Sequence, residues 1–429
     1  MAEPLGRFAE TDDRGTAMNG HAGLLRNDEL RAVVGAQLLS VVGDQIARVA
    51  LAVVVFERSG SPALSGLAVA ATYLPWVMGG PLLVALADRF PRKRVLVACD
   101  LLRALVVALL ALPGIPLVGL VVLLALAELA APVASAASSA VLPDIVEGED
   151  AYVLAAGVTT STGELGQVLG YVLGGAVLVL VGPSGAFLLD AATFVLSALF
   201  LCRLRSRPAP EVVEPASLWA DARAGVTAVT GSRRLRVLVP LAWVGCAASV
   251  VPEALAAPYA ADLAAGPHAV GWLLAAVPVG VVIGNLAVGR FLPAARRDSA
   301  VTPLALLGTL SLLSFALRPD LGPSLALLVG VGGGAAFYVL VGAAIARETP
   351  DALRGRVFGL ANTGLMLSQA LAVLGAGALA SAVGTATAMG LLGLGFTVMV
   401  GGLAVVWESG RAPAQPRPRV RVGLVRGAP

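Results

Sequence analysis

Charged residues are scarce in this chain of 429 residues: Asp, Glu, Lys and Arg make up 13% of it, about half the share that a soluble domain carries. The hydrophobic fraction is 58% and the mean hydropathy is +0.87. So little charge cannot cover the surface of a soluble protein of this length. The composition excludes a soluble enzyme, a nucleic-acid-binding module and a disordered protein, and it indicates an all-α membrane protein with many spans.

Metal-binding and redox residues are also few. The three cysteines, Cys99, Cys202 and Cys246, are odd in number and lie far apart in apolar stretches, so the sequence indicates neither a disulfide framework nor a metal site. The two histidines, His21 and His268, are too few and too separated for a metal cluster. We therefore expect no metal and no cofactor.

Catalytic and nucleotide-binding motifs are absent as well. The sequence contains no hydrolase elbow, metal-ligand spacing or redox pair, so we do not expect an enzyme. It has no glycine-rich phosphate-binding loop ending in Lys-Ser or Lys-Thr, which argues against a process driven directly by ATP hydrolysis. The net charge of +3 does not indicate nucleic acid, because the basic residues line one side of the predicted membrane.

Long apolar runs dominate what is present. About twelve blocks of about 20 apolar residues alternate with short polar breaks, and a helix needs about 20 apolar residues to cross a bilayer. Short Gly- and Pro-containing turns such as Gly182-Pro183-Ser184 separate several of them. The blocks predict helices at residues 30–56, 62–87, 95–112, 117–137, 152–181, 185–204, 235–261, 268–292, 301–317, 324–346, 357–383 and 385–407.

The predicted helices divide into two halves of six. The first segment of the chain is polar and has no apolar core, so we expect no signal peptide. A polar, proline-containing linker separates the halves, and the tail is rich in Arg and Pro. The predicted organisation is a cytoplasmic N-terminal segment at 1–28, bundles at 29–204 and 235–407, a cytoplasmic linker at 205–234 and a disordered cytoplasmic tail at 408–429.

The two halves also match each other in sequence. A constant offset across loops and helices indicates two parallel repeats, an arrangement that places a substrate site between the halves near the membrane midplane. With a shift of 201 residues, Arg89-Phe90 falls on Arg290-Phe291, Thr162-Gly163 on Thr363-Gly364, and Leu173-Gly174 on Leu374-Gly375.

Positive charge marks alternate loops. Arginine and lysine gather after the second, sixth, eighth and tenth helices, whereas the opposite loops hold only Arg58 and Arg318. Cytoplasmic loops carry the excess of Lys and Arg in membrane proteins. We therefore expect the linker and both termini to face the cytoplasm, and the protein to lie in the plasma (inner) membrane.

The loop between the second and third helices carries a family motif. It reads Ala87-Asp88-Arg89-Phe90-Pro91-Arg92-Lys93 and resembles the cytoplasmic loop signature of the major facilitator superfamily, with Val84 and Pro91 where that signature has glycines. The resemblance covers about residues 28–407 and implies a twelve-helix carrier of two six-helix halves. Other segments resemble the branch with bacterial enterobactin exporters and macrolide-type drug efflux carriers: Leu142-Pro143-Asp144, Phe187-Leu188-Leu189-Asp190-Ala191 and Arg354-Gly355-Arg356-Val357-Phe358-Gly359.

This resemblance implies a conformational role for the loop. In the family, residues at the positions of Asp88 and Arg92 lock the outward-facing state, and Arg89 lies between them. Asp100 and Arg103, three residues apart in the third helix, are expected to brace the same cytoplasmic network. The alternative is that these charges only set the topology.

Ionisable residues inside the predicted helices indicate the transport site. A charge at the centre of a membrane helix costs roughly 2.5–3.5 kcal/mol on insertion scales, so each needs a partner, a wet cavity or a function. Asp44 and Arg48 lie one turn apart in the first helix, within reach of an ion pair. Glu128, Glu164 and Glu253 lie in the fourth, fifth and seventh helices. We expect Asp44 or Glu128 to carry the coupling proton; the alternative is structural pairing.

Aromatic and glycine residues add further candidates. Trp243, Phe337 and Tyr338 could stack on a planar apolar substrate, although membrane aromatics more often serve packing or interface anchoring. Small residues at four-residue spacing let another helix approach closely. The fifth helix has such a helix-packing stripe: Gly166, Gly170, Gly174 and Gly175.

Together these features predict a secondary active transporter. We expect it to export a small amphipathic molecule, such as a drug, siderophore or secondary metabolite, by alternating access and in exchange for protons. Its partners are then the small-molecule substrate, protons and the lipid bilayer, with no nucleic acid, and we expect a monomer. Three alternatives remain open: a gradient-independent facilitator or importer, a lipid flippase, and a non-transporting membrane sensor.

Overall fold

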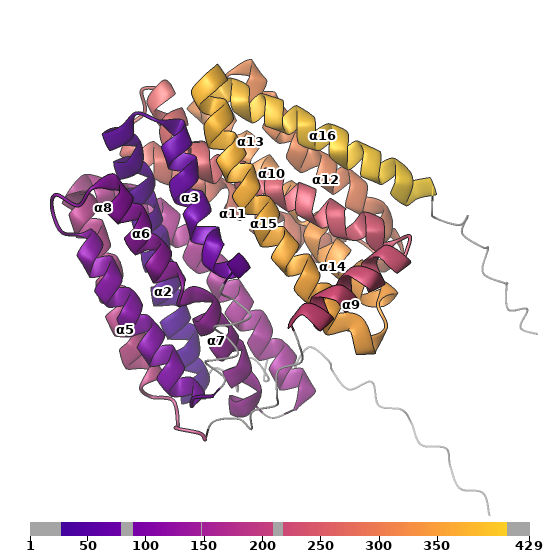
Figure 1. The fold of residues 1–429 in the computed structure, drawn as a ribbon, viewed down its shortest axis with the longest axis horizontal. Coiled ribbons are helices and arrows are strands. Elements are labelled where there is room, and N and C mark those ends of the chain that lie inside the picture. The colour runs from indigo at the N-terminus through magenta and orange to yellow at the C-terminus, as the bar shows by residue number, and fades with distance from the viewer. Residues whose placement is uncertain (1–26, 79–88, 147, 209–217, 410–429) are drawn as a thin grey trace, which may run out of the picture.

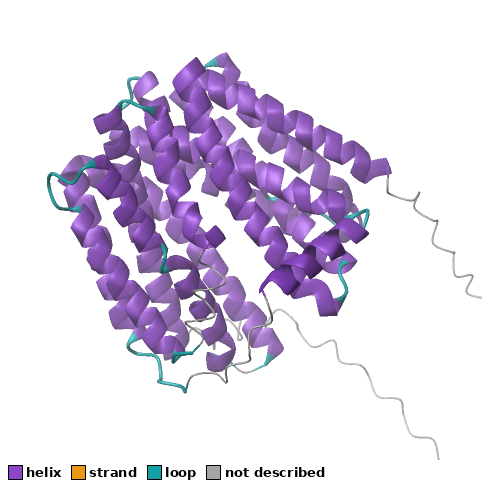
Figure 2. Ribbon diagram, in the orientation of Figure 1, coloured by secondary structure: helices purple, strands orange, loops and turns teal. Residues whose placement is uncertain are grey.

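The computed structural model describes residues 27–78, 89–146, 148–208 and 218–409. Within these ranges every regular element is a helix and no strand occurs (Figure 2). The helices are long and mostly apolar, as the sequence predicts, and they gather into two bundles (Figure 1).

The first bundle contains residues up to 208, and its last helix holds two membrane passes. Gly182 has a non-helical backbone (φ 69°, ψ 179°) and is followed by Pro183. Glycine adopts such a positive φ at little cost, so the chain reverses there between two apolar passes. The helices are α2 (Asp28–Ser59), α3 (Pro62–Met78), α5 (Arg92–Leu110), α6 (Leu117–Glu128), α7 (Ala131–Ile145) and α8 (Glu149–Leu201).

The second bundle follows the linker. Residues 205–234, expected to form only a linker, hold a further helix, α9 (Leu218–Gly231). Gly225 of α9 lies so close to α15 that a methyl group there would stand 2.8 Å from the Arg356 carbonyl oxygen. The other elements are α10 (Leu235–Asp262), α11 (Pro267–Phe291), η1 (Ala294–Arg296), α12 (Arg297–Leu313), η2 (Ser314–Leu317), α13 (Leu321–Ala335), α14 (Phe337–Glu348), α15 (Asp351–Val383) and α16 (Thr385–Ser409).

The fourth pass of each bundle is broken at a corresponding point. In the first bundle α6 ends at Glu128 and α7 begins at Ala131, with Pro132 in its first turn. In the second bundle α13 and α14 meet at Ala336, shortly after Gly332-Gly333-Gly334. Proline is favoured at the start of a helix, and glycine weakens a helix interior, so both breaks have a local cause.

The described helices make twelve membrane passes. Nine described stretches are long and apolar enough to cross a membrane, with α6–α7, η1–α12–η2 and α13–α14 each taken as one. Of these, α8 supplies two passes because of the break at Gly182. The shorter α3 and the more charged α5 complete the set. The predicted fold of two six-helix halves is therefore confirmed.

The two bundles meet at one end of the molecule and diverge at the other (Figure 1). We call the meeting end, which carries Pro62 and His268, the junction end, and the end that carries Arg92 and Arg347 the basic end. At the junction end the helices cross at glycines. A methyl group on Gly66 of α3 would lie 2.6 Å from the Val373 carbonyl oxygen of α15.

The apolar core follows the same division. Near the junction end one continuous cluster of buried side chains joins the bundles, with Val49 of α2 and Leu255 of α10 in the same cluster. Toward the basic end each bundle has its own cluster, one around Val141 and another around Val341. Among the described residues, the halves therefore share a core at one end only.

Candidate functional site

A buried ion pair joins two helices of the first bundle. Nη2 of Arg103, on α5, donates to both carboxylate oxygens of Asp44, on α2, at 2.7 and 2.9 Å. The Arg103 guanidinium also stacks over the ring of Phe194, 4.3 Å from its centroid. These contacts compensate two charges that would be costly to bury alone.

A second ion pair lies one turn along α2. Nη2 of Arg48 lies 3.2 Å from Oε1 of Glu128, the last residue of α6. The sequence favoured a pair between Arg48 and Asp44 on one helix face, but in the structure each of them pairs with a residue of a neighbouring helix. Glu128 is 4% exposed, so its charge needs this partner.

Both ion pairs line a polar cavity of about 380 Å³ in the first bundle. Three carboxylates (Asp44, Asp100 and Glu128) and two guanidinium groups (Arg48 and Arg103) contribute to its wall. The remaining polar lining includes Gln37, Ser40, Trp76, Ser135, Ser138, Ser139, Thr159, Thr160 and Ser197. A wall rich in hydroxyl groups and charges can hold a polar or charged solute.

Asp100 contributes to this cavity rather than to the network at the basic end. It is 5% exposed, and its Oδ2 has no hydrogen-bond partner among the described residues. Arg103, expected to brace the same loop, instead binds Asp44. These two residues of α5 therefore belong with the buried charges of α2 and α6.

Glu253 lies where the two bundles meet. The hydroxyl of Tyr73, on α3, donates to Oε2 of Glu253, on α10, at 3.1 Å. Small cavities of about 30 and 130 Å³ flank this contact, and Tyr171 lines both. Arg48 lines the smaller one, which brings Glu253 near the charges of the first bundle. A carboxylate at this position can affect the contact between the bundles.

The glycine stripe of α8 lies against two helices. A methyl group on Gly170 would stand 2.7 Å from the Val42 carbonyl oxygen of α2, and Gly166 and Gly174 approach the same helix. Gly175 instead faces α11, where a methyl group would lie 2.9 Å from Cα of His268. Three of these glycines therefore serve packing within the first bundle, and Gly175 serves the junction.

Four other candidates lie away from the three cavities. Glu164 of α8 is half-buried and lines none of them. Trp243 lies against Gly364 and donates from Nε1 to the Ala361 carbonyl oxygen at 2.9 Å.

The aromatic pair of α14 also lies in the second bundle. Phe337 is 1% exposed and packs on Gly245 of α10, whereas Tyr338 is 40% exposed. A stacking role for the aromatic candidates stays a prediction.

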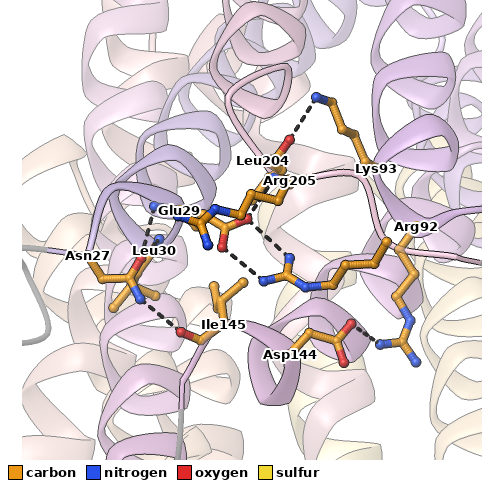
Figure 3. Close-up of polar contacts among 10 residues, drawn as sticks. Asn27, Glu29, Leu30, Arg92, Lys93, Asp144, Ile145, Leu204 and Arg205 are labelled. Atoms are coloured by element: carbon orange, nitrogen blue, oxygen red, sulfur yellow. Dashed lines mark hydrogen bonds and ion pairs between the residues drawn. The ribbon is translucent and has the colours of Figure 1, made fainter.

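Arg92, a residue of the family loop, makes two contacts with α7. Its Nη1 donates to the Asp144 carboxylate at 2.5 Å (Figure 3). It also donates to the Ala140 carbonyl oxygen at 2.6 Å, so it ties the start of α5 to the end of α7. Arg89 is exposed, and Asp88 lies outside the described residues. The observed contact of Arg92 is therefore within one bundle.

The second bundle has a corresponding ion pair with the charges exchanged. Asp298, at the start of α12, accepts a hydrogen bond of 2.6 Å from Arg347, near the end of α14. Next to it, Glu348 pairs with Arg234, just before α10. In both bundles, therefore, the third pass is tied to the fourth at the basic end.

Sequence reasoning missed two residues of the junction. Tyr73 and Tyr171 each carry a hydroxyl within an apolar run, and neither stands in a pattern that indicates a partner. Only the approach of α10 brings Glu253 to them. Asp144 was part of a family segment, Leu142-Pro143-Asp144, but its link to Arg92 depends on the packing of α5 against α7.

Comparisons with known proteins agree with this architecture. A family model described as the Major Facilitator Superfamily matches residues 33–252 and 242–427. No curated protein sequence matches the chain.

Several solved structures have the same fold. A POT family transporter in complex with 5-aminolevulinic acid has 13% identity and a TM-score of 0.69, over 89% of this chain and 96% of that chain. A bacterial homologue of the human lysosomal transporter Spinster, inward-facing and unoccupied, has 14% identity and a TM-score of 0.70, over 92% and 99%. A mutant of the nucleoside transporter NupG has 14% identity and a TM-score of 0.67, over 88% and 99%. At these identities the likeness concerns the fold alone.

Proposed function

Because the chain belongs to the Major Facilitator Superfamily of membrane transporters, we propose that it exports a small amphipathic molecule by alternating access, in exchange for protons. The observation that carries this proposal is the hydrogen bond from Tyr73 to Glu253, which joins the two bundles through an ionisable group. A proton on Glu253 changes the charge at the junction, and this links proton binding to movement of the bundles.

Glu253 is a better candidate for the coupling acid than Asp44 or Glu128. Each of the latter already has a guanidinium partner, at 2.7 Å for Asp44 and 3.2 Å for Glu128. Among the described residues, the hydrogen-bond partner of Glu253 is the neutral phenol of Tyr73. Loss of its charge therefore leaves no arginine unpaired, which makes its protonation less costly than that of the other two.

The direction of transport is argued from the arrangement of charge. Basic loops face the cytoplasm in membrane proteins, so we place the basic end there. The bundles diverge toward that end and share a core at the other (Figure 1). A molecule could then enter the polar cavity from the cytoplasm, as the first step of export requires.

The test combines a search for the substrate with a coupling assay. Cells with and without the gene are challenged with a panel of drugs and siderophores, and a compound that the gene makes less toxic is taken forward. Its transport is then measured in proteoliposomes with and without an imposed pH gradient. We expect the gradient to accelerate transport by the wild-type protein.

The Glu253→Gln variant tests the coupling residue. We expect its response to the gradient to fall about tenfold, a coupling free energy of roughly 1.4 kcal/mol. Asp262→Asn, at the exposed end of the same helix, is the matched control and should keep the response. Asp44→Asn should also keep it, even if the rate falls. An unchanged response in Glu253→Gln would remove Glu253 from coupling, and transport by the wild type without any gradient effect would favour a facilitator.

A further inference from the structure

A second polar cavity lies at the basic end, away from the transport site. It measures about 340 Å³ and is formed by the start of α5, the end of α7 and the segment that follows α8. Figure 3 shows several of its charged side chains and their contacts. We call it the basic pocket, and its lining is Arg92, Lys93, Val141, Asp144, Leu204, Arg205, Arg207 and Pro208.

The charges of the basic pocket do not balance. Four cationic side chains face a single carboxylate, that of Asp144. Arg92 is paired with Asp144, and Arg207 with Glu29 at 2.9 Å. Among the described residues neither Lys93 nor Arg205 forms a side-chain ion pair. The Lys93 ammonium donates to the uncharged carbonyl oxygens of Cys202 and Leu204 at 2.6 and 2.7 Å. The charge of Arg205 is offset only by Glu29, which already pairs with Arg207, so the basic pocket keeps an excess of positive charge.

The first turn of α5 adds to this excess. Lys93 lies between two arginines there, and the turn contains no acidic residue and no capping side chain. Positive charge at a helix N-terminus is unfavourable because the helix dipole is positive there. The free N–H groups of such a turn bind phosphate groups well. An anion in the basic pocket would therefore satisfy both the side chains and the helix end.

A neighbouring cavity of about 490 Å³ shows that the imbalance is local. It is lined by three arginines and by three carboxylates, those of Asp28, Glu29 and Asp144, so its charges cancel. Both cavities lie at the same end of the molecule and share Asp144, Arg205 and Arg207. Of these two cavities, the basic pocket is therefore the one with an excess of positive charge that attracts an anion.

The surroundings of the basic pocket suit a lipid. Val141, Leu204 and Pro208 give part of its wall an apolar character. The two helices that flank it present exposed leucines along their membrane-spanning parts, among them Leu102 of α5 and Leu199 of α8. A basic pocket between membrane helices at the cytoplasmic side is a typical binding site for an anionic lipid headgroup.

We propose that the basic pocket binds the phosphate of an anionic phospholipid, with Lys93 and Arg205 as its principal contacts. The acyl chains lie along the exposed leucines of α5 and α8. The bound phosphate then links the start of α5 to the segment after α8, next to the ion pair of Arg92 with Asp144.

Native mass spectrometry of the full-length purified protein tests this proposal. The protein is mixed with phosphatidylglycerol or with phosphatidylcholine of the same acyl chains, and the bound fraction is measured. We expect phosphatidylglycerol to bind about tenfold more tightly, because only its headgroup carries a net negative charge. The variant is Lys93→Gln with Arg205→Gln, in which this preference should disappear.

The control variant removes the same charge from the other bundle. Arg296→Gln with Arg297→Gln lies at the basic end but outside the basic pocket, and it should keep the preference. Equal binding of the two lipids, or equal losses in both variants, would overturn the proposal.

Two further measurements separate the remaining outcomes. Inorganic phosphate is added in place of lipid, and the rise in the midpoint of thermal unfolding is compared with the rise that phosphatidylglycerol causes. Equal rises would assign the pocket to a soluble anion. If the double variant does not yield folded protein by gel filtration, Arg205→Gln alone is used, since its side chain is exposed. Because lipid binding is measured without transport, failure here is distinguishable from failure of the proposed function.

Discussion

At the scale of single residues, the centre of the first bundle depends on two ion pairs that join different helices. Helix α2 supplies an acid and a base, Asp44 and Arg48, and each reaches its partner on another helix. The pair of Asp44 with Arg103 is the more enclosed, with side-chain exposures of 20% and 8%. Since an unpaired charge in this environment is expensive, these pairs hold α2, α5 and α6 together.

Asp44→Asn should therefore destabilise the protein. It leaves the buried guanidinium of Arg103 without its ion-pair partner, which costs about 3 kcal/mol. The measurement is the midpoint of thermal unfolding in detergent. Arg103→Met combined with Asp44→Asn should recover part of the loss, because the guanidinium that lost its partner is removed as well. A double variant less stable than Asp44→Asn alone would contradict this view of the pair.

The sequence located these charged residues but not their partners. Spacing along one helix allows Asp44 and Arg48 to pair, and nothing local shows that Arg103 and Glu128 lie closer to them. Partner choice depends on how α2, α5 and α6 pack, which a sequence pattern does not encode. Tyr73 was missed for the same reason, because its hydroxyl is significant only beside Glu253.

At the scale of elements, close contact between α2 and α8 depends on glycine. Gly170 and Gly174 lie against the backbone of α2, where a methyl group would stand 2.7 Å from the Val42 carbonyl oxygen and 3.2 Å from Cα of Ile46, respectively. Helices approach this closely only where side chains are missing. The stripe therefore sets the distance between the first and fifth passes.

Gly170→Ala should weaken this helix pair. The added methyl group overlaps α2, and overpacking of this kind costs about 1–3 kcal/mol. Gly157→Ala is the matched control on the same helix, since a methyl group there meets nothing within 4 Å. Alanine favours the helix over glycine by up to about 1 kcal/mol, so the control should be neutral or stabilising. Similar unfolding midpoints for both variants would contradict a packing role for Gly170.

Helices could be predicted from the sequence where a long apolar run determines them. The turn at Gly182 was expected from its sequence, and it is where α8 reverses. Helix α9 was missed because its close contact with α15 at Gly225 appears only after the chain has folded. The break after Glu128 was also missed, although Pro132 could have indicated a helix start there.

At the scale of the whole molecule, the two ends differ in how the bundles are held. One apolar core spans both bundles near the junction end, whereas each has its own core toward the basic end. Within each bundle the basic end is tied by an ion pair, Arg92 with Asp144 and Asp298 with Arg347. Each bundle is thus internally braced where the two separate, as rigid-body rocking requires.

A cross-link at the junction end should stop this rocking. The backbone N–H of Ala63, on α3, donates to the hydroxyl of Ser381, on α15, at 3.0 Å, so cysteines at these two positions lie within reach of each other. The variant is Ala63→Cys with Ser381→Cys, in a background with the exposed Cys202 changed to Ser.

Oxidation of this variant should abolish transport, and reduction should restore it. The disulfide joins α3 to α15 covalently, so the two bundles cannot separate at the junction end while it is intact. The measurement is substrate transport in proteoliposomes, with each single-cysteine variant as control. If the cross-linked protein transports as fast as the same protein after reduction of the disulfide, the junction end does not open during the cycle. The movement must then occur within the bundles, because a shared core that stays closed leaves no other path across the membrane.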